Sequence, residues 1–267
     1  MSDAALARHD VALVRADNPG PFTLAGTNTW LVGRNPCWIV DPGPALDAHV
    51  AAVLEEAGRR GGVGAIVLTH DHGDHAGAAG ALRARAGGAP VAAARWEGAD
   101  RRLADGDAVG PLVAVATPGH AADHLAFVAG RVCFTGDAVL AESSVFVAPD
   151  PGALRGYLAA LERLRAMQLE LLCTGHGPPV DDPARLLDRY LEHRRDRERR
   201  LLAALGDGLR TVDELLDRVW DDAPASLRLA ATATLAAHLD KLDEERRLPG
   251  GVQRPPWPPP GGLRPVV

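Results

Sequence analysis

One short segment of the chain, residues 69–75 (Thr-His-Asp-His-Gly-Asp-His), places four side chains that commonly bind metal ions within six positions. It follows the apolar run at 65–68, which is typical of a buried β-strand. Imidazoles this close together repel one another when protonated, whereas a divalent metal binds neutral imidazole and ionised carboxylate. His70 and His72 alternate as neighbours do on an extended chain, so both can reach one ion, and the Asp-His pair that ends the segment can serve a second. The spacing therefore predicts a hydrolytic site with two metal ions, with a solvated loop or a single structural zinc as the alternatives.

Three further residues of the same kind lie downstream, and each follows a short apolar run and a glycine-containing turn. They are His120, Asp137 and His176. Loops that follow strands on a rigid scaffold commonly present functional groups. A closed structural zinc needs only four ligands, so the seven ligand-type residues of this chain favour the two-metal site.

The His-x-His-x-Asp-His segment, with the three later residues following in order, resembles the metallo-beta-lactamase fold superfamily over roughly residues 10 to 205. Other stretches are similar to the beta-lactamase-like protein 2 group within it, whose characterised animal member is a single-strand-specific endoribonuclease. These stretches are 18–24, 26–32, 117–124, 175–178 and His193-Arg194, together with the helical C-terminal region. Thr174 departs from that group, which usually has Pro before the Gly-His-Gly; the change alters the stiffness of the turn and leaves the ligands unchanged.

The resemblance implies how the ligands are shared between two divalent ions, which are expected to be zinc, with manganese or iron(II) as alternatives. It assigns His70, His72 and His120 to the first ion, Asp74, His75 and His176 to the second, and Asp137 to a bridge between them. Asp74 and Asp137 are also the expected catalytic residues. Two close dications repel strongly, and a shared carboxylate and hydroxide relieve that repulsion. Because metal binding ionises the shared water near neutral pH, the expected reaction is hydrolysis by attack of the bridging hydroxide.

Five further residues are candidates for supporting the ligands or for contacting substrate. Asp41 is predicted to accept a hydrogen bond from a ligand imidazole, to serve the turn before the following helix, or to do both. Asp71 is either an outer-sphere base or merely exposed, and His124 either meets substrate or supports a ligand. His193 and Arg197, one helical turn apart, either reach a phosphate near the cleft or belong to a solvated, salt-bridged helix face.

Short apolar or β-branched runs alternate with segments of helical spacing, which predicts an α/β layered architecture. Strands are predicted near 11–16, 29–32, 37–41, 65–69, 90–94, 112–116, 124–128, 131–136 and 169–173. Helices are predicted over 45–58, 76–86, 152–167 and 182–205, from 211, and over 226–247. The four-layer αββα sandwich of the superfamily is what the resemblance implies, with the ligands along one rim.

The chain is expected to divide into two domains and a tail. Residues 1–205 are predicted to form the hydrolase domain and 206–248 a small helical, winged-helix-like domain. Residues 249–267 form a Pro-rich stretch that is expected to bury too little apolar surface to become ordered. Thr211 and Glu214 fit a capping box at the first helix of the C-terminal domain.

Composition limits the surroundings and partners of the protein. Of its 267 residues, 46% are hydrophobic and 24% charged, as in globular proteins, and the net charge of −6 argues against a surface that coats nucleic acid. Cys37, Cys133 and Cys173 lack close spacing, which predicts buried thiols in a reducing compartment. The first ten residues carry no apolar leader and no run reaches membrane-spanning length. A cytoplasmic protein without a membrane partner is therefore expected, as a monomer or a homodimer.

Three functions are compatible with these residues. The first is hydrolysis of phosphodiesters in single-stranded RNA, which would make the protein an endonuclease, and it follows from the resemblance and the helical C-terminal region. The second is hydrolysis of a small-molecule thioester, as in hydroxyacylglutathione hydrolases or on another acyl thioester; the single lysine, Lys241, weighs against glutathione. The third, a non-catalytic binding module, would need incomplete ligands or a strongly basic C-terminal region, and residues 211–247 are acidic overall.

Overall fold

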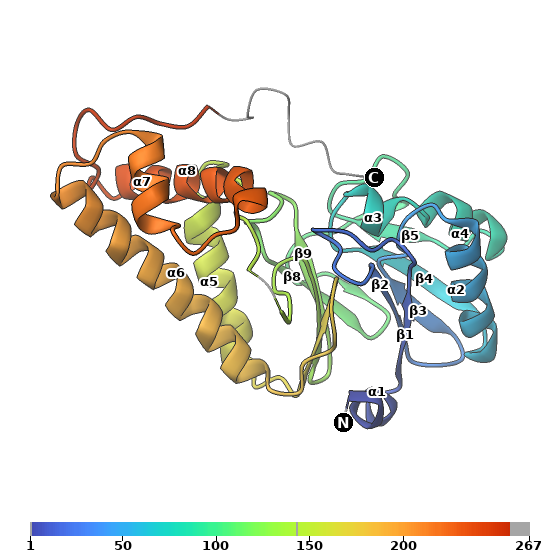
Figure 1. Cartoon of the computed structure of the whole chain (residues 1–267). Helices are drawn as coiled ribbons and strands as arrows, with labels where there is room; N and C mark the ends of the chain where they lie inside the picture. Colours follow the sequence, from blue (N-terminus) through green and yellow to red (C-terminus); the bar gives the residue numbers. More distant parts are fainter. Residues whose placement is uncertain (1, 143, 257–267) are drawn as a thin grey trace.

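The computed structural model describes residues 2–142 and 144–256, and over these residues it contains two main β-sheets (Figure 1). The strands of the first sheet, in spatial order, are β1 Val11–Arg15, β2 Asn28–Val32, β3 Cys37–Val40, β4 Val63–Leu68, β5 Val91–Ala93 and β6 Arg101–Arg102. Those of the second are β11 Leu171–Thr174, β10 Val132–Gly136, β9 Leu125–Ala129, β8 Leu112–Ala116 and β7 Ala108–Val109.

Helices connect most of the parallel neighbours within each sheet. α2 (Asp47–Arg59) joins β3 to β4, and α3 (Gly73–Ala76) and α4 (Ala79–Arg85) lie between β4 and β5. α5 (Ala153–Ala166) joins β10 to β11. Parallel strands cannot be joined by a tight hairpin and need a longer crossover. Between the parallel strands β5 and β6 this crossover contains no helix. Figure 1 shows α2 and α4 on one outer face, with α5 and α6 (Pro183–Gly206) on the other.

Three apolar layers hold this arrangement together. Residues such as Trp30, Phe127 and Phe134 are buried between the two sheets. A second layer lies between the first sheet and α2 to α4, and a third lies between the second sheet and α5 and α6. Strand β4 is buried from Ala65 onward because sheet and helices cover both of its faces, which explains its continuous apolar run. The predicted four-layer αββα sandwich is confirmed.

The elements differ from the predicted ones in a few places. The helix predicted over 76–86 begins earlier, at Gly73, and is divided into α3 and α4. α1 (Ser2–Arg8) and the short strands β6 and β7 were not predicted from the sequence. Both strands have only two residues, and the β6 side chains are exposed, so no periodic pattern marks them.

The C-terminal helices pack against the end of α6. They are α7 (Val212–Val219), a 3-10 turn at Ala225–Leu227 and α8 (Arg228–Glu244). The capping box of Thr211 and Glu214 is present at the start of α7, as predicted. The apolar core of this region also takes Leu201, Ala204 and Leu205 from α6. Since α6 runs through residue 206 and serves both regions, the domain boundary at 205/206 stays a prediction.

The Pro-rich stretch expected to be a loose tail is described only in part. Val252 packs against the C-terminal core, and Gln253 N donates to Arg210 O at 2.8 Å. Arg254 forms ion pairs with Asp240 and Asp243. Residues 249–256 therefore contact the C-terminal helices, and residues 257–267 lie outside the described part of the chain.

Two expectations from composition can be compared with the structure. All three cysteines are free and buried, as predicted. Among the described residues, no helix has both the length and the apolar character needed to cross a membrane.

His238 in α8 provides a test of packing between the C-terminal helices and α6. Its ring is 1% exposed and lies edge-on to Trp220, and neither ring nitrogen has a hydrogen-bond partner among the described residues. Burial, with Arg194 adding to it, lowers the pKa of His238 well below its usual range, so the ring is neutral. Unpartnered buried polar atoms cost free energy that an apolar ring of similar shape avoids. His238→Phe is expected to raise the free energy of unfolding by about 1–2 kcal/mol, measured by urea denaturation. A free energy of unfolding below that of the wild type would contradict the view that the His238 nitrogens lack partners.

Candidate metal centre

The predicted ligands lie in loops that follow four strands, and backbone hydrogen bonds between the sheets bring these loops together. The loop after β4 carries residues 70–75, and the loops after β8, β10 and β11 carry His120, Asp137 and His176. Leu125 N in the second sheet donates to Thr69 O at 2.8 Å. Asn28 N in the first sheet donates to Gly175 O, also at 2.8 Å. The site therefore needs both sheets in their native places.

Two imidazole nitrogens of the predicted ligands each lie close to two carboxylate oxygens. Nε2 of His75 and Nε2 of His176 lie 3.3 Å apart. Each nitrogen also lies 3.4 Å from Asp137 Oδ1. Asp74 Oδ2 is 3.5 Å from the His75 nitrogen and 3.3 Å from the His176 nitrogen. For zinc with bonds of about 2.0–2.1 Å, tetrahedral ligands are separated by about 3.3–3.4 Å, so each of these oxygens is spaced from the two nitrogens as the ligands of one ion are.

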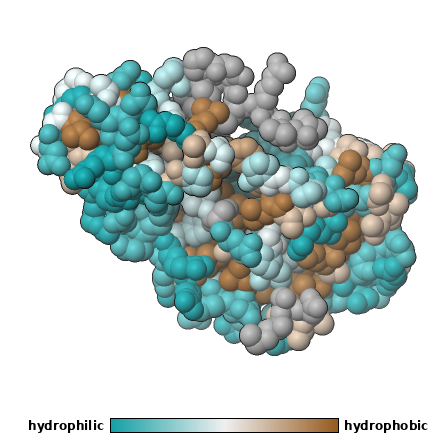
Figure 2. Space-filling model, viewed as in Figure 1, coloured by the Kyte–Doolittle hydropathy of each residue, from teal (hydrophilic) through white to brown (hydrophobic). Residues whose placement is uncertain are grey.

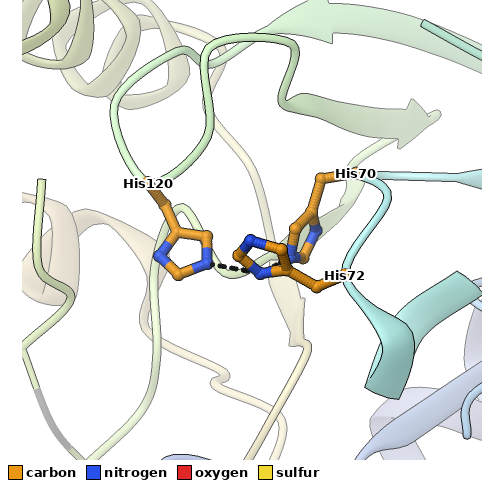
Figure 3. Close-up of side chains that lie close together, drawn as sticks. All are labelled: His70, His72 and His120. Carbon is orange, nitrogen blue, oxygen red and sulfur yellow. Dashed lines mark hydrogen bonds between the residues drawn. The ribbon is translucent and has the colours of Figure 1, made fainter. Parts of the chain in front are cut away.

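A second set of donors lies beside the first (Figure 3). His72 Nδ1 is 2.9 Å from His70 Nε2 and 3.1 Å from His120 Nε2. The three rings come from the β4 and β8 loops and turn these nitrogens toward one another, as Figure 3 shows. Asp137 Oδ2 lies 3.6 Å from His120 Nε2, so its two oxygens face different sets.

The structure thus brings all seven predicted ligands into one cluster. Three overlapping groups have ligand atoms within 4.8 Å of one another: His70, His72 and His120; His70, His75 and Asp137; and Asp74, His75 and His176. The chemistry of the donor set and its spacing fit two divalent ions with Asp137 between them. That metal ions bind there, and how the ligands divide between them, stays a prediction.

The electrostatics of the cluster call for positive charge at its centre. Burial alone would raise the pKa of Asp137, but His75 and His176 hold it well below its usual range. Burial opposes protonation of His176, yet Asp137 and Asp74 raise its pKa to about 9. Burial lowers the pKa of His120 to about 4. A dication can supply the charge that the carboxylates attract while leaving the imidazoles neutral, which is the form that binds metal.

Asp41 orients two of the ligand imidazoles. Its carboxylate lies 2.9 Å from His75 Nδ1, so that nitrogen carries the proton and Nε2 faces the cluster. Asp41 also accepts hydrogen bonds from Thr69 N at 2.7 Å and Thr69 Oγ1 at 2.8 Å. With its proton directed at Asp41, the Thr69 hydroxyl accepts from His70 Nδ1 at 2.9 Å. The structure therefore places Asp41 in the ligand-supporting role proposed from the sequence.

His124 and Asp71 take the less direct of their predicted roles. His124 is 1% exposed, and its Nδ1 lies 2.8 Å from Thr117 Oγ1. Its Nε2 accepts from Asp137 N at 3.2 Å, so the ring supports the backbone of a ligand and does not face substrate. Asp71 is exposed, and no interaction within the described chain links it to the seven ligands.

Arg197 requires a correction to the suggestion that it reaches a phosphate near the cleft. Its side chain is 6% exposed, and Nη2 pairs with both carboxylate oxygens of Asp222, at 2.6 and 2.7 Å. It also donates to Val219 O and lies over the Trp220 ring. Because these groups occupy its donors, Arg197 is not free to bind phosphate. His193 lies outside the cluster, in the wall of a neighbouring cavity.

Several supporting contacts were not predicted from the sequence. Asn28 Nδ2 donates to Thr174 O and Gly177 O, and Trp30 Nε1 donates to Thr174 O, which fixes the loop that carries His176. Gly175 allows this loop to approach the cluster, since a Cβ there would lie 2.6 Å from Asp137 Oδ1. The contacts join residues more than 140 positions apart, so no local pattern reveals them.

Comparison with known proteins agrees with this fold. The sequence model of the metallo-beta-lactamase superfamily matches residues 22–109 and 94–176, and that of the beta-lactamase associated winged helix domain matches 211–248. The beta-lactamase-like protein 2 homolog of Caenorhabditis elegans is 32% identical over 92% of this chain and 86% of its own length. The atrochrysone carboxyl ACP thioesterase of Aspergillus chevalieri is 31% identical over 91% of this chain and 85% of its own.

A solved structure supports the same assignment. The metallo-beta-lactamase family protein from Thermus thermophilus superimposes with a TM-score of 0.70 and 26% identity, covering 88% of this chain and 94% of its own. The superfamily match extends over more than half of the chain, and the resemblance to the beta-lactamase-like protein 2 group is confirmed. The chain therefore belongs to the metallo-beta-lactamase superfamily of hydrolases, and a beta-lactamase associated winged helix domain lies in its C-terminal region.

Proposed function

We propose that this chain is a zinc-dependent hydrolase that cleaves acyl thioesters. The observation that carries the proposal is a small cavity beside the cluster, with a volume of about 270 Å³. It lies between the loop that follows Asp137 and helix α6, and Ala141 and Leu186 are the aliphatic residues of a lining that also contains polar side chains. This volume is near the lower end for small-ligand pockets, which suits an acyl group and is too small for an extended strand.

Apolar side chains lie close to the cluster. Phe146 packs edge-on against the His120 ring at 4.7 Å between centroids. A Cβ added at Gly177, next to His176, would lie 3.5 Å from Leu24 and 3.7 Å from Ala141. In Figure 2 brown and white surface gathers in the middle of the molecule, between teal regions to either side. An acyl chain gains from such surroundings, whereas a polyanion needs a run of basic side chains.

The chain's own residues have separate tasks in this reaction. His70, His72 and His120 would hold one ion, Asp74, His75 and His176 the other, and Asp137 both. When bound, the two ions supply a water of lowered pKa and polarise the carbonyl under attack. Asp74, the ligand carboxylate whose side chain is 20% exposed, can take up the proton of the attacking water. As the water oxygen bonds to the acyl carbon, the thioester C–S bond breaks, and the proton held by Asp74 passes to the leaving sulfur, so that a carboxylic acid and a thiol are released.

Relatives support the thioester proposal in one specific way. The Aspergillus chevalieri protein, which is similar over 91% of this chain, carries a name that specifies thioesterase activity on an acyl carrier protein. That name describes the fungal protein, and the carrier of the acyl group here stays open. The proposal for this chain is limited to the thioester bond and an acyl group of modest size.

Hydrolysis of single-stranded RNA is the second candidate. It is favoured by the similarity to beta-lactamase-like protein 2 homologs, which extends over 92% of the chain for the Caenorhabditis elegans protein. The net charge of −6 weighs against a long basic groove for a nucleic-acid strand. RNA hydrolysis therefore stays a prediction of lower rank.

A single assay separates the two candidates. Zinc-loaded full-length protein is incubated in parallel with acyl thioesters of N-acetylcysteamine and coenzyme A, and with an unstructured RNA oligonucleotide. We expect thioester turnover and intact RNA, with turnover lost in a His176→Ala variant purified in the same way, which controls for contaminating hydrolases. Cleavage of RNA by the wild type alone, with all thioesters left intact, would overturn the proposal in favour of the second candidate.

A further inference from the structure

The cavity beside the cluster contains polar groups that the reaction itself does not use. Its lining comes from the loop after Asp137 and from α6: Ala141, Glu142, Ser144, Leu186, Arg189, Tyr190 and His193. The Tyr190 hydroxyl is engaged with the backbone of Leu140 at 2.9 and 3.1 Å. Arg189 is exposed, and His193 is half-buried. The cavity therefore combines the apolar side chains of Ala141 and Leu186 with polar groups, and Arg189 and His193 supply hydrogen-bond donors on its α6 side.

The protonation of His193 is determined by its neighbour on the helix. Arg197 Nε donates to His193 Nε2 at 3.3 Å, so Nε2 is the acceptor. Burial, together with Arg194 and Arg197, lowers the pKa of His193 to about 4, so the ring is neutral at pH 7. A neutral imidazole whose Nε2 accepts must carry its proton on Nδ1. Within the described chain Nδ1 has no hydrogen-bond partner, so it can donate to a ligand in the cavity.

Arg197 is itself held by the C-terminal helices. Asp222, in the segment after α7, accepts from Arg197 Nη2 with both carboxylate oxygens, and Val219 O at the end of α7 accepts from Nη1. The guanidinium carbon lies 5.5 Å from the centre of the Trp220 ring. Contacts on several sides hold an arginine side chain more firmly than a single contact does. The C-terminal region thus positions His193 through Arg197.

We propose that this cavity binds the acyl group of the substrate, and that His193 Nδ1–H, assisted by Arg189, donates a hydrogen bond to an oxygen on that group. The preferred substrates are then thioesters of oxygenated acyl groups, such as 3-oxoacyl groups, over plain alkyl ones. Arg197 and Asp222 are positioning residues that keep the ring in this tautomer. The preference for oxygenated acyl groups rests on the proposed thioesterase function. The Nδ1–H tautomer of His193, and the hydrogen bond that its Nε2 accepts from Arg197, do not depend on that function.

The tautomer can be measured without any assay of activity. In zinc-loaded full-length protein with ¹⁵N-labelled histidine, the His193 ring is expected to show its proton on Nδ1, the less common form in free histidine. Arg197→Met should return the ring to the Nε2–H form. Arg200→Met is the matched control, since Arg200 is on the same helix and pairs with Asp221. A proton on Nε2 of His193 in the wild type would overturn the inference whether or not the protein is a thioesterase.

Binding can be tested with amides that cannot turn over as thioesters do. Titration with the amide analogue of a 3-oxobutyryl thioester is expected to shift the His193 ring signals, and the butyryl analogue should leave them in place. Equal shifts from both probes, or none from either, would contradict the proposed hydrogen bond. These results stand even if the thioester assay fails, so the two failures can be told apart.

Kinetics then test the role of the ring in specificity. One net hydrogen bond corresponds to a preference of about 5- to 10-fold in kcat/KM for the 3-oxobutyryl over the butyryl thioester. His193→Asn places an amide donor near the Nδ1 position and should keep the preference. His193→Gln reaches only toward the Nε2 position and should lose this preference, mainly through a higher KM for the 3-oxobutyryl thioester. Loss in both variants, or in neither, would refute the proposed role of Nδ1.

Discussion

Replacing Asp137 by Ala is expected to lower kcat/KM by about 1,000-fold or more, because the carboxylate lies between both sets of donors. Its Oδ1 faces His75 and His176 at 3.4 Å, and its Oδ2 faces His120 at 3.6 Å. A metal pair contributes several kcal/mol of charge stabilisation, and about 1.4 kcal/mol corresponds to a factor of ten in rate. The measurement is steady-state kinetics on the best thioester, together with metal content per chain.

The matched control for this variant is Asp71→Ala. Asp71 lies in the same loop as the first ligands but is exposed and joins none of them within the described chain. Its loss is expected to change kcat/KM by less than about threefold, since exposed side chains away from such features contribute little. Comparable losses of kcat/KM in both variants would show that Asp137 contributes only negative charge to the cleft and does not join two ions.

Replacing Asp41 by Asn is expected to lower metal affinity and activity by about 10- to 100-fold, although Asp41 is assigned to neither ion. The carboxylate accepts from Thr69 N, Thr69 Oγ1 and His75 Nδ1, and an amide cannot accept at its nitrogen. The His75 and His70 rings would then be free to turn. Zinc affinity, measured by competition with a chromogenic chelator, reports this effect separately from turnover.

Asp47→Asn is the control for the Asp41 variant. Asp47 is an exposed acidic residue in the first turn of α2, a few positions along the chain. Zinc affinity in this variant should match the wild type, and the free energy of unfolding should change only slightly. If Asp41→Asn also binds zinc as tightly as the wild type, its carboxylate does not orient the ligands.

The sequence revealed the cluster because each ligand directly follows a buried strand. In residues 69–75 the donors are adjacent in the chain, and their spacing alone indicates a shared ion. His120, Asp137 and His176 repeat the same order of strand, glycine turn and donor. The ends of neighbouring strands lie along one edge of the fold and bring such residues together. The order of strand, turn and donor, found four times in the sequence, therefore predicts the seven ligands that cluster in the structure.

Other features depend on contacts that no local pattern encodes. Arg197 has the charge of a phosphate ligand, but its partner Asp222 lies 25 residues further along the chain. Asn28 and Trp30 support Thr174 from another sheet, 146 and 144 residues away. Only packing of the complete fold decides these pairings. The supporting residues were therefore predicted less well than the ligands themselves.

Both sheets contribute to the site, which links activity to the integrity of the whole fold. The β4 loop comes from the first sheet, and the β8, β10 and β11 loops come from the second. Activity is also expected to depend on the C-terminal helices, because helix α6 contributes to their apolar core and also carries His193. Changes in the C-terminal region are therefore expected to reach the cavity through this helix.

Anomalous X-ray diffraction at the zinc absorption edge, from crystals of full-length protein, tests the central assignment most directly. We expect two peaks, one among His70, His72 and His120 and the other among Asp74, His75 and His176, with the Asp137 carboxylate between them. A single peak, no peak, or peaks outside this group of side chains would contradict the two-metal centre.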